Sequence, residues 1–199
     1  MVAFLTGSRA EYGLLEQLFW LVPDSQWLVT GSHLSPAHGL TVDEIDGPIA
    51  GRIECVLSSD TRVGMCRSFS LAVSSFAEHL DRLRPDAVVI LGDRYEMLAG
   101  AIAAHVCRIS IVHIHGGESS IGSLDNAFRH SISHMARLHF PATEQSADRL
   151  RQFGLTDIHC LGALGCDGLE KQKWDWDGTI IVLFHPATKA NENYKNIQE

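Results

Sequence analysis

Short apolar runs rich in β-branched residues alternate along the chain with longer segments of helical period. The runs that predict strands cover residues 2–6, 26–30, 52–57, 87–91, 109–113, 138–141, 157–161 and 179–184. Strands that are separated by helices are joined by right-handed crossovers and pair in parallel. The alternation therefore predicts an α/β fold built on a Rossmann-like, doubly wound parallel sheet.

The segment between the third and fourth predicted strands carries the longest helical pattern. Its apolar positions recur every three or four residues and form one stripe: Val63, Cys66, Phe69, Val73, Phe76, Leu80 and Leu83. This spacing is typical of an amphipathic helix whose apolar side faces the core. A residue before proline avoids the right-handed α region, so Arg84-Pro85 predicts the end of the helix.

The length of 199 residues suits one full domain and part of a second. Residues 1–168 predict the first domain, and the polar stretch 169–178 predicts a linker. A new apolar strand then opens within 179–199 and is followed only by a polar stub. One strand cannot bury a core, so we expect this segment to be the start of an incomplete second domain.

Composition narrows the classes of protein to consider. Lys and Arg number 16 against 24 Asp and Glu, a net charge of −8 that argues against a nucleic-acid or anionic-membrane partner. The five cysteines form no C-x-x-C pair, and Cys55, Cys107 and Cys160 lie in or beside apolar runs, which favours buried free thiols in a reducing compartment. The chain shows neither an 18-residue apolar stretch nor the basic start of a signal peptide. We therefore expect a soluble cytoplasmic protein.

Two of the predicted strands end abruptly in glycine, charge and imidazole. Residues 91–96 read LGDRYE and residues 111–118 read IVHIHGGE. An α/β sheet places ligand chemistry on the loops beyond the carboxyl ends of its strands. The side chains that we expect on this rim are Asp93, Arg94, His113, His115 and Glu118. A helix N-cap is an alternative for Asp93 alone, but it does not explain five converging polar groups.

Two further loops follow predicted strands. In TGSRAEYG, a glycine turn before a helix offers free backbone N–H groups at Gly7 and Ser8, and Arg9 adds a charge suited to phosphate or carboxylate. The pattern is not G-x-G-x-x-G, and a structural turn with a surface arginine is the alternative. His33 lies in the loop after the second strand, where a solvated histidine is favoured over a catalytic one.

The next predicted helix carries Asp125, Asn126, Arg129 and His130. Asp125 and Arg129 are four residues apart and share a face. They indicate either an ordinary intrahelical ion pair or a positioned acid–base group.

A metal site is a further alternative. His113 and His115 alternate on a strand and would point the same way. No third and fourth ligands are spaced for zinc, so we predict no metal, and a metal-dependent hydrolase stays an alternative built on this pair.

Five motifs in order carry a resemblance to a known family. They are TGSRAEYGLL, GSHLSPAHGLTVDEI, GDRYEMLAGAIAA, HIHGGESSIGSLDNAFRHSISHMARLHFPATE and FHPAT. Together they resemble the hydrolysing UDP-N-acetylglucosamine 2-epimerases, in the branch that forms N-acetylmannosamine for sialic acid. The resemblance implies a glycosyltransferase-B architecture, in which two Rossmann-like domains face a cleft. The first domain then supplies most catalytic groups and the second holds much of the uridine diphosphate.

The resemblance also implies an activity. The enzyme removes the C2 proton, expels UDP from C1 and adds water to the resulting glucal, which gives the C2-inverted free sugar. This chemistry requires no nicotinamide or metal, so no cofactor is expected. The implied partners are a UDP-sugar and further copies of the full-length protein in a dimer or tetramer. UDP-N,N'-diacetylbacillosamine as substrate and a non-catalytic nucleotide-sugar-binding fragment stay as alternatives.

Residue roles follow from the same resemblance. The implied catalytic residues are Asp93, His115, Glu118, Asp125, Arg129 and His185. The implied substrate contacts are Gly7, Ser8, Arg9, His33, Arg94, His113, Gly116, Gly117 and Asn126. The two aspartates would be the acid–base carboxylates, oriented by Arg129, and Arg9 and His185 would hold the diphosphate. The sequence departs from common family patterns at His115, where some members have an acid, and at Asn126, which is often acidic.

Overall fold

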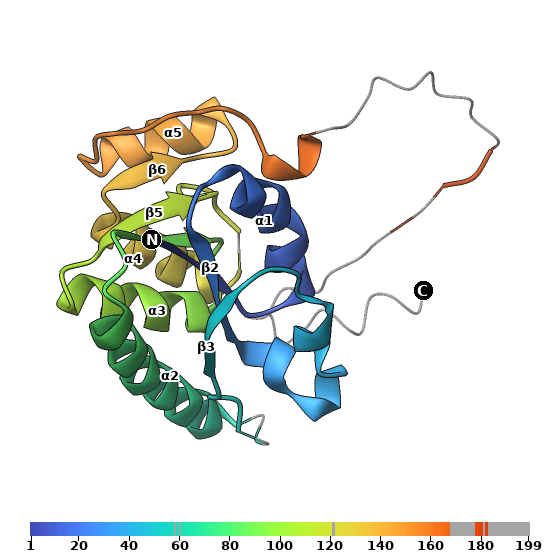
Figure 1. Ribbon diagram of the computed structural model, residues 1–199. Helices are drawn as coiled ribbons and strands as arrows, with labels where there is room; N and C mark the ends of the chain where they lie inside the picture. Colours follow the sequence, from blue (N-terminus) through green and yellow to red (C-terminus); the bar gives the residue numbers. More distant parts are fainter. Residues whose placement is uncertain (58, 60, 121, 168–177, 181, 183–199) are drawn as a thin grey trace.

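A computed structural model describes residues 1–57, 59, 61–120, 122–167, 178–180 and 182. Six strands form one sheet in the order β3-β2-β1-β4-β5-β6, and every pair of neighbours is parallel (Figure 1). The strands are β1 (Val2–Thr6), β2 (Ser25–Thr30), β3 (Ile49–Ile53), β4 (Ala87–Leu91), β5 (Ser110–Ile114) and β6 (Leu138–Phe140). This order is that of a doubly wound Rossmann-like sheet and confirms the predicted fold class.

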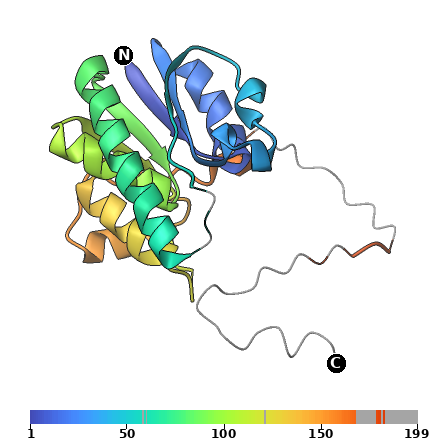
Figure 2. The ribbon, with the colours of Figure 1, turned by 90° about the horizontal axis from the view of Figure 1, so that it is seen from below.

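Helices cover both faces of the sheet (Figure 2). They are α1 (Arg9–Leu21), α2 (Arg62–Leu83), α3 (Tyr95–Val106), α4 (Asp125–Met135) and α5 (Glu144–Gln152). Short 3-10 turns are η1 (Gly31–Leu34), η2 (Pro36–His38), η3 (Thr41–Glu44) and η4 (Leu164–Cys166). Helix α3 packs between α2 and α4, while α1 packs on β1 and β2.

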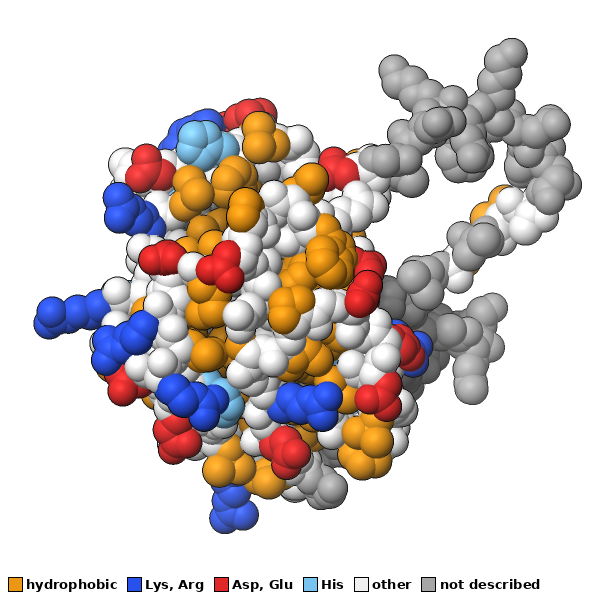
Figure 3. All heavy atoms as spheres, viewed as in Figure 1, with side chains coloured by type: hydrophobic (Ala, Val, Ile, Leu, Met, Phe, Trp, Pro, Cys, Tyr) orange, Lys and Arg blue, Asp and Glu red, His pale blue; other side chains and the backbone are white. Residues whose placement is uncertain are grey.

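The core consists of two clusters, one on each face of the sheet. Ala3 and Leu5 of β1 join the side chains of α2, α3 and α4, whereas Phe4 between them joins α1. Successive side chains of a strand point to opposite faces, so β1 serves both clusters. Burial on both faces explains why the strands read as continuous apolar runs. On the face shown in Figure 3, acidic and basic side chains are interspersed with one another.

Two strand predictions need correction. The third strand spans Ile49–Ile53 and not 52–57. Its neighbour β2 ends at Thr30, which is opposite Ile53. The Thr30 hydroxyl donates a hydrogen bond to the Ile53 carbonyl at 2.8 Å. The residues after Ile53 therefore have no strand to pair with. The predicted strand 157–161 is reduced to a single bridge between His139 and Ile158, because β6 is only three residues long.

Helix α2 confirms the predicted end but not the whole stripe. Arg84 caps the helix in the left-handed conformation before Pro85. The buried positions step by four: Gly64, Ser68, Ala72, Phe76 and Leu80. Val63 is 60% exposed and Cys66 is also exposed. In the first turns of α2 the buried side chains are small or polar because they contact the preceding loop. Ser68 Oγ accepts a hydrogen bond from the Leu57 N–H at 3.2 Å, and Ser59 packs against Gly64.

Several predictions lie wholly or largely outside the described residues. They concern the linker 169–178, the second-domain strand and His185, and they stay predictions. All five cysteines are free, but only Cys55 is fully buried, so the expectation of buried thiols at Cys107 and Cys160 was too strong. In the part of the chain that the structure describes, no helix is long and apolar enough to cross a membrane.

Candidate active site

The candidate site lies at the carboxyl edge of the sheet, where the strand order reverses between β1 and β4. The loop after β1 leads to α1 on one face, and the loop after β4 leads to α3 on the other. Such a switch point is where open α/β sheets bind ligands. Because β1, β4 and β5 are parallel neighbours, Arg9, Asp93, His115 and Glu118 lie at this one edge, as predicted.

A carboxylate–guanidinium pair lies at the centre of this edge. Asp93 accepts a hydrogen bond from Nη2 of Arg129, which is on α4, and their side chains are 19% and 8% exposed. Among the described residues, Nε and Nη1 of Arg129 are buried without a hydrogen-bond partner. Asp125 instead exchanges hydrogen bonds with Ser123 at 3.1 Å. The arginine thus pairs across elements and not along its own helix.

The environment of Asp93 favours proton exchange. Its pKa is raised, mainly because burial disfavours the charged form. The negative charges of Asp125 and Glu118 raise this pKa further, and the positive charge of Arg129 partly offsets the rise. A carboxyl whose pKa is raised toward the working pH suits general acid–base catalysis.

His115 occupies a left-handed backbone conformation, with φ of 59°. Its N–H donates to the Phe140 carbonyl at 2.9 Å, and its ring Nε2 accepts the Leu164 N–H at 3.4 Å. Burial lowers the pKa of the ring, and Glu118 opposes that effect. A half-buried imidazole of this kind is neutral at pH 7.

The glycines after His115 are needed for close packing. A Cβ on Gly116 would approach His113 Nδ1 to 2.8 Å. Gly117 has φ of 77°, and its Cβ would lie 2.3 Å from the Ser146 carbonyl oxygen. Both glycines are therefore buried, and their lack of a side chain allows the loop to pack closely on its neighbours.

His113 is fully buried below the rim and does not face a ligand. Its Nε2 donates to the Gly92 carbonyl at 2.9 Å, and its Nδ1 shares a hydrogen bond with Ser133 Oγ at 3.0 Å. Burial lowers its pKa to about 3. This placement corrects the expected substrate contact, since both ring nitrogens are engaged. It also removes one of the two ligands that the metal interpretation required.

His33 is likewise buried, which corrects its interpretation as a solvated histidine. Its Nε2 lies 3.0 Å from Thr6 Oγ1, and its Nδ1 lies 2.7 Å from Thr41 Oγ1. Burial lowers the pKa of this ring as well. His33 therefore connects the end of β1 to the η1 and η3 turns.

The glycine turn after β1 is not open to an anion in the way its sequence predicted. The Gly7 N–H and the Ser8 hydroxyl both donate to Glu11 Oε2, at 3.0 and 2.9 Å. Arg9 is exposed and pairs with Glu44 at 3.1 Å. The correction follows from the capping-box spacing Ser8-x-x-Glu11, which signals a carboxylate that satisfies this turn.

Two buried carboxylates at the switch point escaped the sequence reasoning. Glu96 is 1% exposed and pairs with both Nε and Nη2 of Arg94, at 3.3 and 3.1 Å. Glu11 lies 3.8 Å from Arg94 Nε, and its pKa is raised because burial outweighs that cation. Arg94 is therefore held on the rim by carboxylates from two helices. No sequence signal would have found Glu96.

The loop after Glu118 is fixed from α4. Asn126 Oδ1 accepts the Ser120 N–H at 3.0 Å, and Asn126 Nδ2 donates to Ser119 Oγ at 3.3 Å. The amide has both a donor and an acceptor for this task, which a carboxylate lacks. The amide at this position thus orders the loop that follows Glu118.

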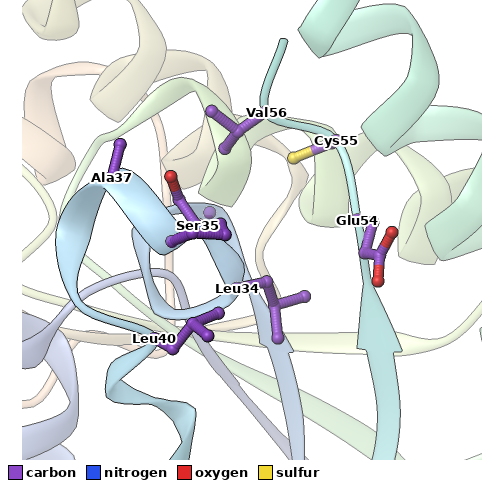
Figure 4. A pocket seen from close by; sticks show the side chains of 9 residues that line it. Leu34, Ser35, Ala37, Leu40, Glu54, Cys55 and Val56 are labelled. Carbon is purple, nitrogen blue, oxygen red and sulfur yellow. The ribbon is translucent and has the colours of Figure 1, made fainter. Parts of the chain in front are cut away.

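A pocket of about 640 Å³ opens at the same edge beyond β2 and β3 (Figure 4). Leu34 and Ser35 line one side, and Glu54, Cys55 and Val56 line the other. It borders the switch point because its Gly31 lies against Gly7, where a Cβ would approach the Gly7 carbonyl to 2.8 Å. Burial raises the pKa of the Cys55 thiol, so this pocket wall is not nucleophilic.

The fold and this rim define a class: Rossmann-like α/β domains that carry carboxylates paired with arginines at the switch point of a parallel sheet. The chain belongs to the UDP-N-acetylglucosamine 2-epimerase family, whose family model matches residues 23–199.

Characterised relatives agree with this assignment. The chain is 41% identical to the GDP/UDP-N,N'-diacetylbacillosamine 2-epimerase (hydrolyzing) of Campylobacter jejuni, covering 100% of this chain and 56% of the relative. It is 35% identical to the UDP-N,N'-diacetylbacillosamine 2-epimerase (hydrolyzing) of Legionella pneumophila, with coverages of 98% and 57%. The chain thus spans about half the length of these relatives.

A solved structure shows the same fold. The crystal structure of UDP-GlcNAc 2-epimerase from Neisseria meningitidis bound to UDP-GlcNAc superposes with a TM-score of 0.69 at 20% identity. The match covers 82% of this chain and 46% of that one.

Proposed function

We propose that this chain carries the acid–base domain of a hydrolysing UDP-sugar 2-epimerase, which converts UDP-N-acetylglucosamine and water into N-acetylmannosamine and UDP. The observation that carries the proposal is the buried Asp93–Arg129 pair at the switch point, with Asp125 and Glu118 close enough to raise the pKa of Asp93. Family membership supports it.

The reaction divides into an elimination and a hydration. In the elimination, one carboxylate of the pair Asp93 and Asp125 accepts the C2 proton. The C2–H electrons form the C1–C2 double bond, and the C1–O bond breaks so that UDP leaves with that electron pair. In the hydration, water adds its hydroxyl to C1, and C2 receives a proton on the face opposite to the one it lost. Arg129 keeps Asp93 in place through both steps.

The remaining rim residues fit supporting roles. Arg9 is exposed at the start of α1 and offers its guanidinium to the diphosphate. Arg94, fixed by Glu96, adds a second cation on the same edge. His115 and Glu118 border the pair and suit the delivery of water. His185 stays proposed as a diphosphate ligand.

UDP-N,N'-diacetylbacillosamine is the second candidate substrate. It is favoured by the names of the Campylobacter and Legionella relatives, which both specify that sugar. Both candidates carry a 2-acetamido group next to the proton that is removed, so the same rim serves either.

A chimaera tests the proposal. Residues 1–199 replace the matching half of the Campylobacter relative, and the chimaera is incubated in D₂O with each UDP-sugar. We expect UDP release, with inversion and deuterium incorporation at C2 of the free sugar. A folded chimaera that releases UDP without inversion or deuterium at C2, or that turns over neither sugar, contradicts the proposal. The unmodified relative is the control.

A further inference from the structure

A second pocket, of about 300 Å³, includes Asp125 in its lining, and its apolar wall has no role in the mechanism above. It is formed near the starts of α2, α3 and α4, and its lining residues are Met65, Arg94, Tyr95, Leu124, Asp125 and Phe128. Asp125 lies one helical turn before Arg129, which holds Asp93. The pocket therefore opens next to the carboxylates that are proposed to exchange the C2 proton.

The pocket wall is unusually apolar for a charged rim. Met65 is 45% exposed and Leu124 is 50% exposed, and both line the hollow with Phe128. Phe128 is partly buried and packs against the core. Large apolar side chains that stay in contact with water and together form a hollow indicate a ligand with an apolar part.

The proposed substrates contain such a part at the required place. The C2 carbon that loses its proton also carries the acetamido group, whose methyl group is only a few bonds away. When C2 lies at the carboxylates, the acetyl group must lie in the space beside them. The amide N–H can donate to a carboxylate such as Asp125, while the methyl group gains from contact with an apolar wall.

We propose that this pocket receives the acetyl group of the 2-acetamido substituent, and that Met65 and Leu124 are specificity-determining residues that favour it over a 2-hydroxyl group. The inference rests on the proposed function. It explains how one rim serves N-acetylglucosamine and diacetylbacillosamine, because both sugars share this substituent.

Methyl NMR of the 199-residue chain tests the placement. The chain has four methionines, which are labelled with ¹³C at the ε-methyl group. We expect millimolar UDP-N-acetylglucosamine to shift the Met65 signal and to give a nuclear Overhauser effect between Met65 and the acetyl methyl group. UDP-glucose, which lacks the acetamido group, gives no such effect. Met135 is at the carboxyl end of α4, away from Asp125, and its signal serves as the internal control.

Matched variants test the specificity. Met65→Gln combined with Leu124→Gln removes the exposed apolar wall, and Leu71→Gln is the control because Leu71 is also on α2, is 48% exposed and lines a different pocket. We expect the unmodified chain to bind UDP-N-acetylglucosamine about tenfold more tightly than UDP-glucose, in line with the discrimination of small apolar groups. The double variant lowers this ratio by at least about threefold through weaker UDP-N-acetylglucosamine binding, and the control keeps it.

The outcomes separate the two proposals. If UDP-N-acetylglucosamine binds but leaves the Met65 methyl signal unshifted, or if the double variant keeps the ratio, the acetyl pocket is wrong and the proposed function stands. Where the isolated chain binds too weakly to measure, the same measurements are made on the chimaera. If the chimaera binds neither UDP-sugar, the proposed function of this rim fails, and the acetyl pocket fails with it.

Discussion

Asp93 and His113 show how burial sets the proton chemistry of single residues on this edge. Burial raises the pKa of the Asp93 carboxyl and lowers that of the His113 ring to about 3. Both shifts favour the neutral form. Asp93 stays partly exposed, so its carboxyl can contact a ligand. Its raised pKa makes the protonated form easier to populate, which suits proton transfer. For His113, whose ring nitrogens are both engaged, the neutral form secures the Gly92 turn that carries Asp93.

Replacing Asp93 by Asn in the chimaera should lower turnover by at least about 100-fold, the usual scale for a positioned acid–base group. The amide cannot take the C2 proton, but its oxygen can still accept the Arg129 hydrogen bond. The free energy of unfolding should fall by about 1–3 kcal/mol, because Arg129 keeps a hydrogen bond but loses the opposite charge. Steady-state kinetics and urea unfolding measure the two effects. Turnover close to that of the unmodified chimaera would leave Asp93 with a capping role.

The chain should become less stable as the pH falls below about 6.5, the pKa of an unfolded histidine. His113, with a folded pKa of about 3, stays neutral in the native state while the unfolded chain binds a proton. This one residue contributes a slope of up to about 1.4 kcal/mol per pH unit between pH 6.5 and 3. The pKa values of His33 and His139 are lowered too and act in the same direction.

The raised pKa values of Glu11 and Asp93 have the opposite effect on stability. At pH values above about 4 these carboxyls bind protons more readily in the folded state, so they stabilise the fold as the pH falls. Urea unfolding between pH 7.5 and 5.5 therefore isolates the histidine effect best. His113→Gln should have a shallower slope than the unmodified chain, whereas His105→Gln, at an exposed position on α3, should keep it. Equal slopes in all three proteins would show that the burial of His113 does not govern acid stability.

At the scale of elements, the loops at the carboxyl edge are fixed by contacts between consecutive units of the fold. Asn126 of α4 holds the loop after Glu118, and Glu96 of α3 holds Arg94. Arg149 of α5 donates to the Gly117 carbonyl, so the turn after β5 is fixed from a second helix. Helices α3, α4 and α5 consequently hold the loops of the site in place.

Gly117→Ala should destabilise the chain by about 2–4 kcal/mol. The substitution combines a left-handed backbone conformation with a Cβ placed 2.3 Å from the Ser146 carbonyl oxygen. Gly154→Ala is a matched control, since Gly154 has the same φ of 77° but open space around its Cβ position. It should cost only about 1 kcal/mol. Urea unfolding of both variants decides, and equal losses would show that packing against α5 is unimportant.

At the scale of the whole molecule, the first domain is well defined by its two core clusters, whereas the domain boundary at 168 and the oligomeric state stay predictions. The chain spans about half the length of its hydrolysing relatives. Enzymes that pass through reactive intermediates require the substrate to be enclosed and dried. A rim on one domain provides the carboxylates but only one side of such an enclosure.

The isolated 199-residue chain should accordingly show negligible turnover of UDP-N-acetylglucosamine and only weak affinity for UDP. Release of UDP and of N-acetylmannosamine from the purified chain measures this, with the chimaera as the active control. Turnover near the common enzyme range of about 1 per second or more would mean that a single domain encloses the sugar sufficiently.

The architecture and the location of the site follow from the local pattern of the chain. Apolar runs such as 87–91 and 2–6 are strands because their side chains are buried on both faces, and their abrupt ends in polar residues mark the functional edge. Both features depend on local pattern and on the geometry of parallel sheets. Both features can be read from each segment of the sequence without knowledge of its neighbours in the fold.

The identity of the polar groups that meet at this edge depends on long-range packing. Arg129 has a suitable partner four residues away on its own helix, yet it pairs with Asp93, which is 36 residues distant in sequence. The sequence places His33 and His113 at the rim, but other elements of the fold bury both side chains. Glu96 is buried because Arg94 and Gly31 pack around it at the switch point. Periodicity tells which face of an element is buried, but not which side chain of another element it meets there. That choice depends on packing between segments far apart in the chain.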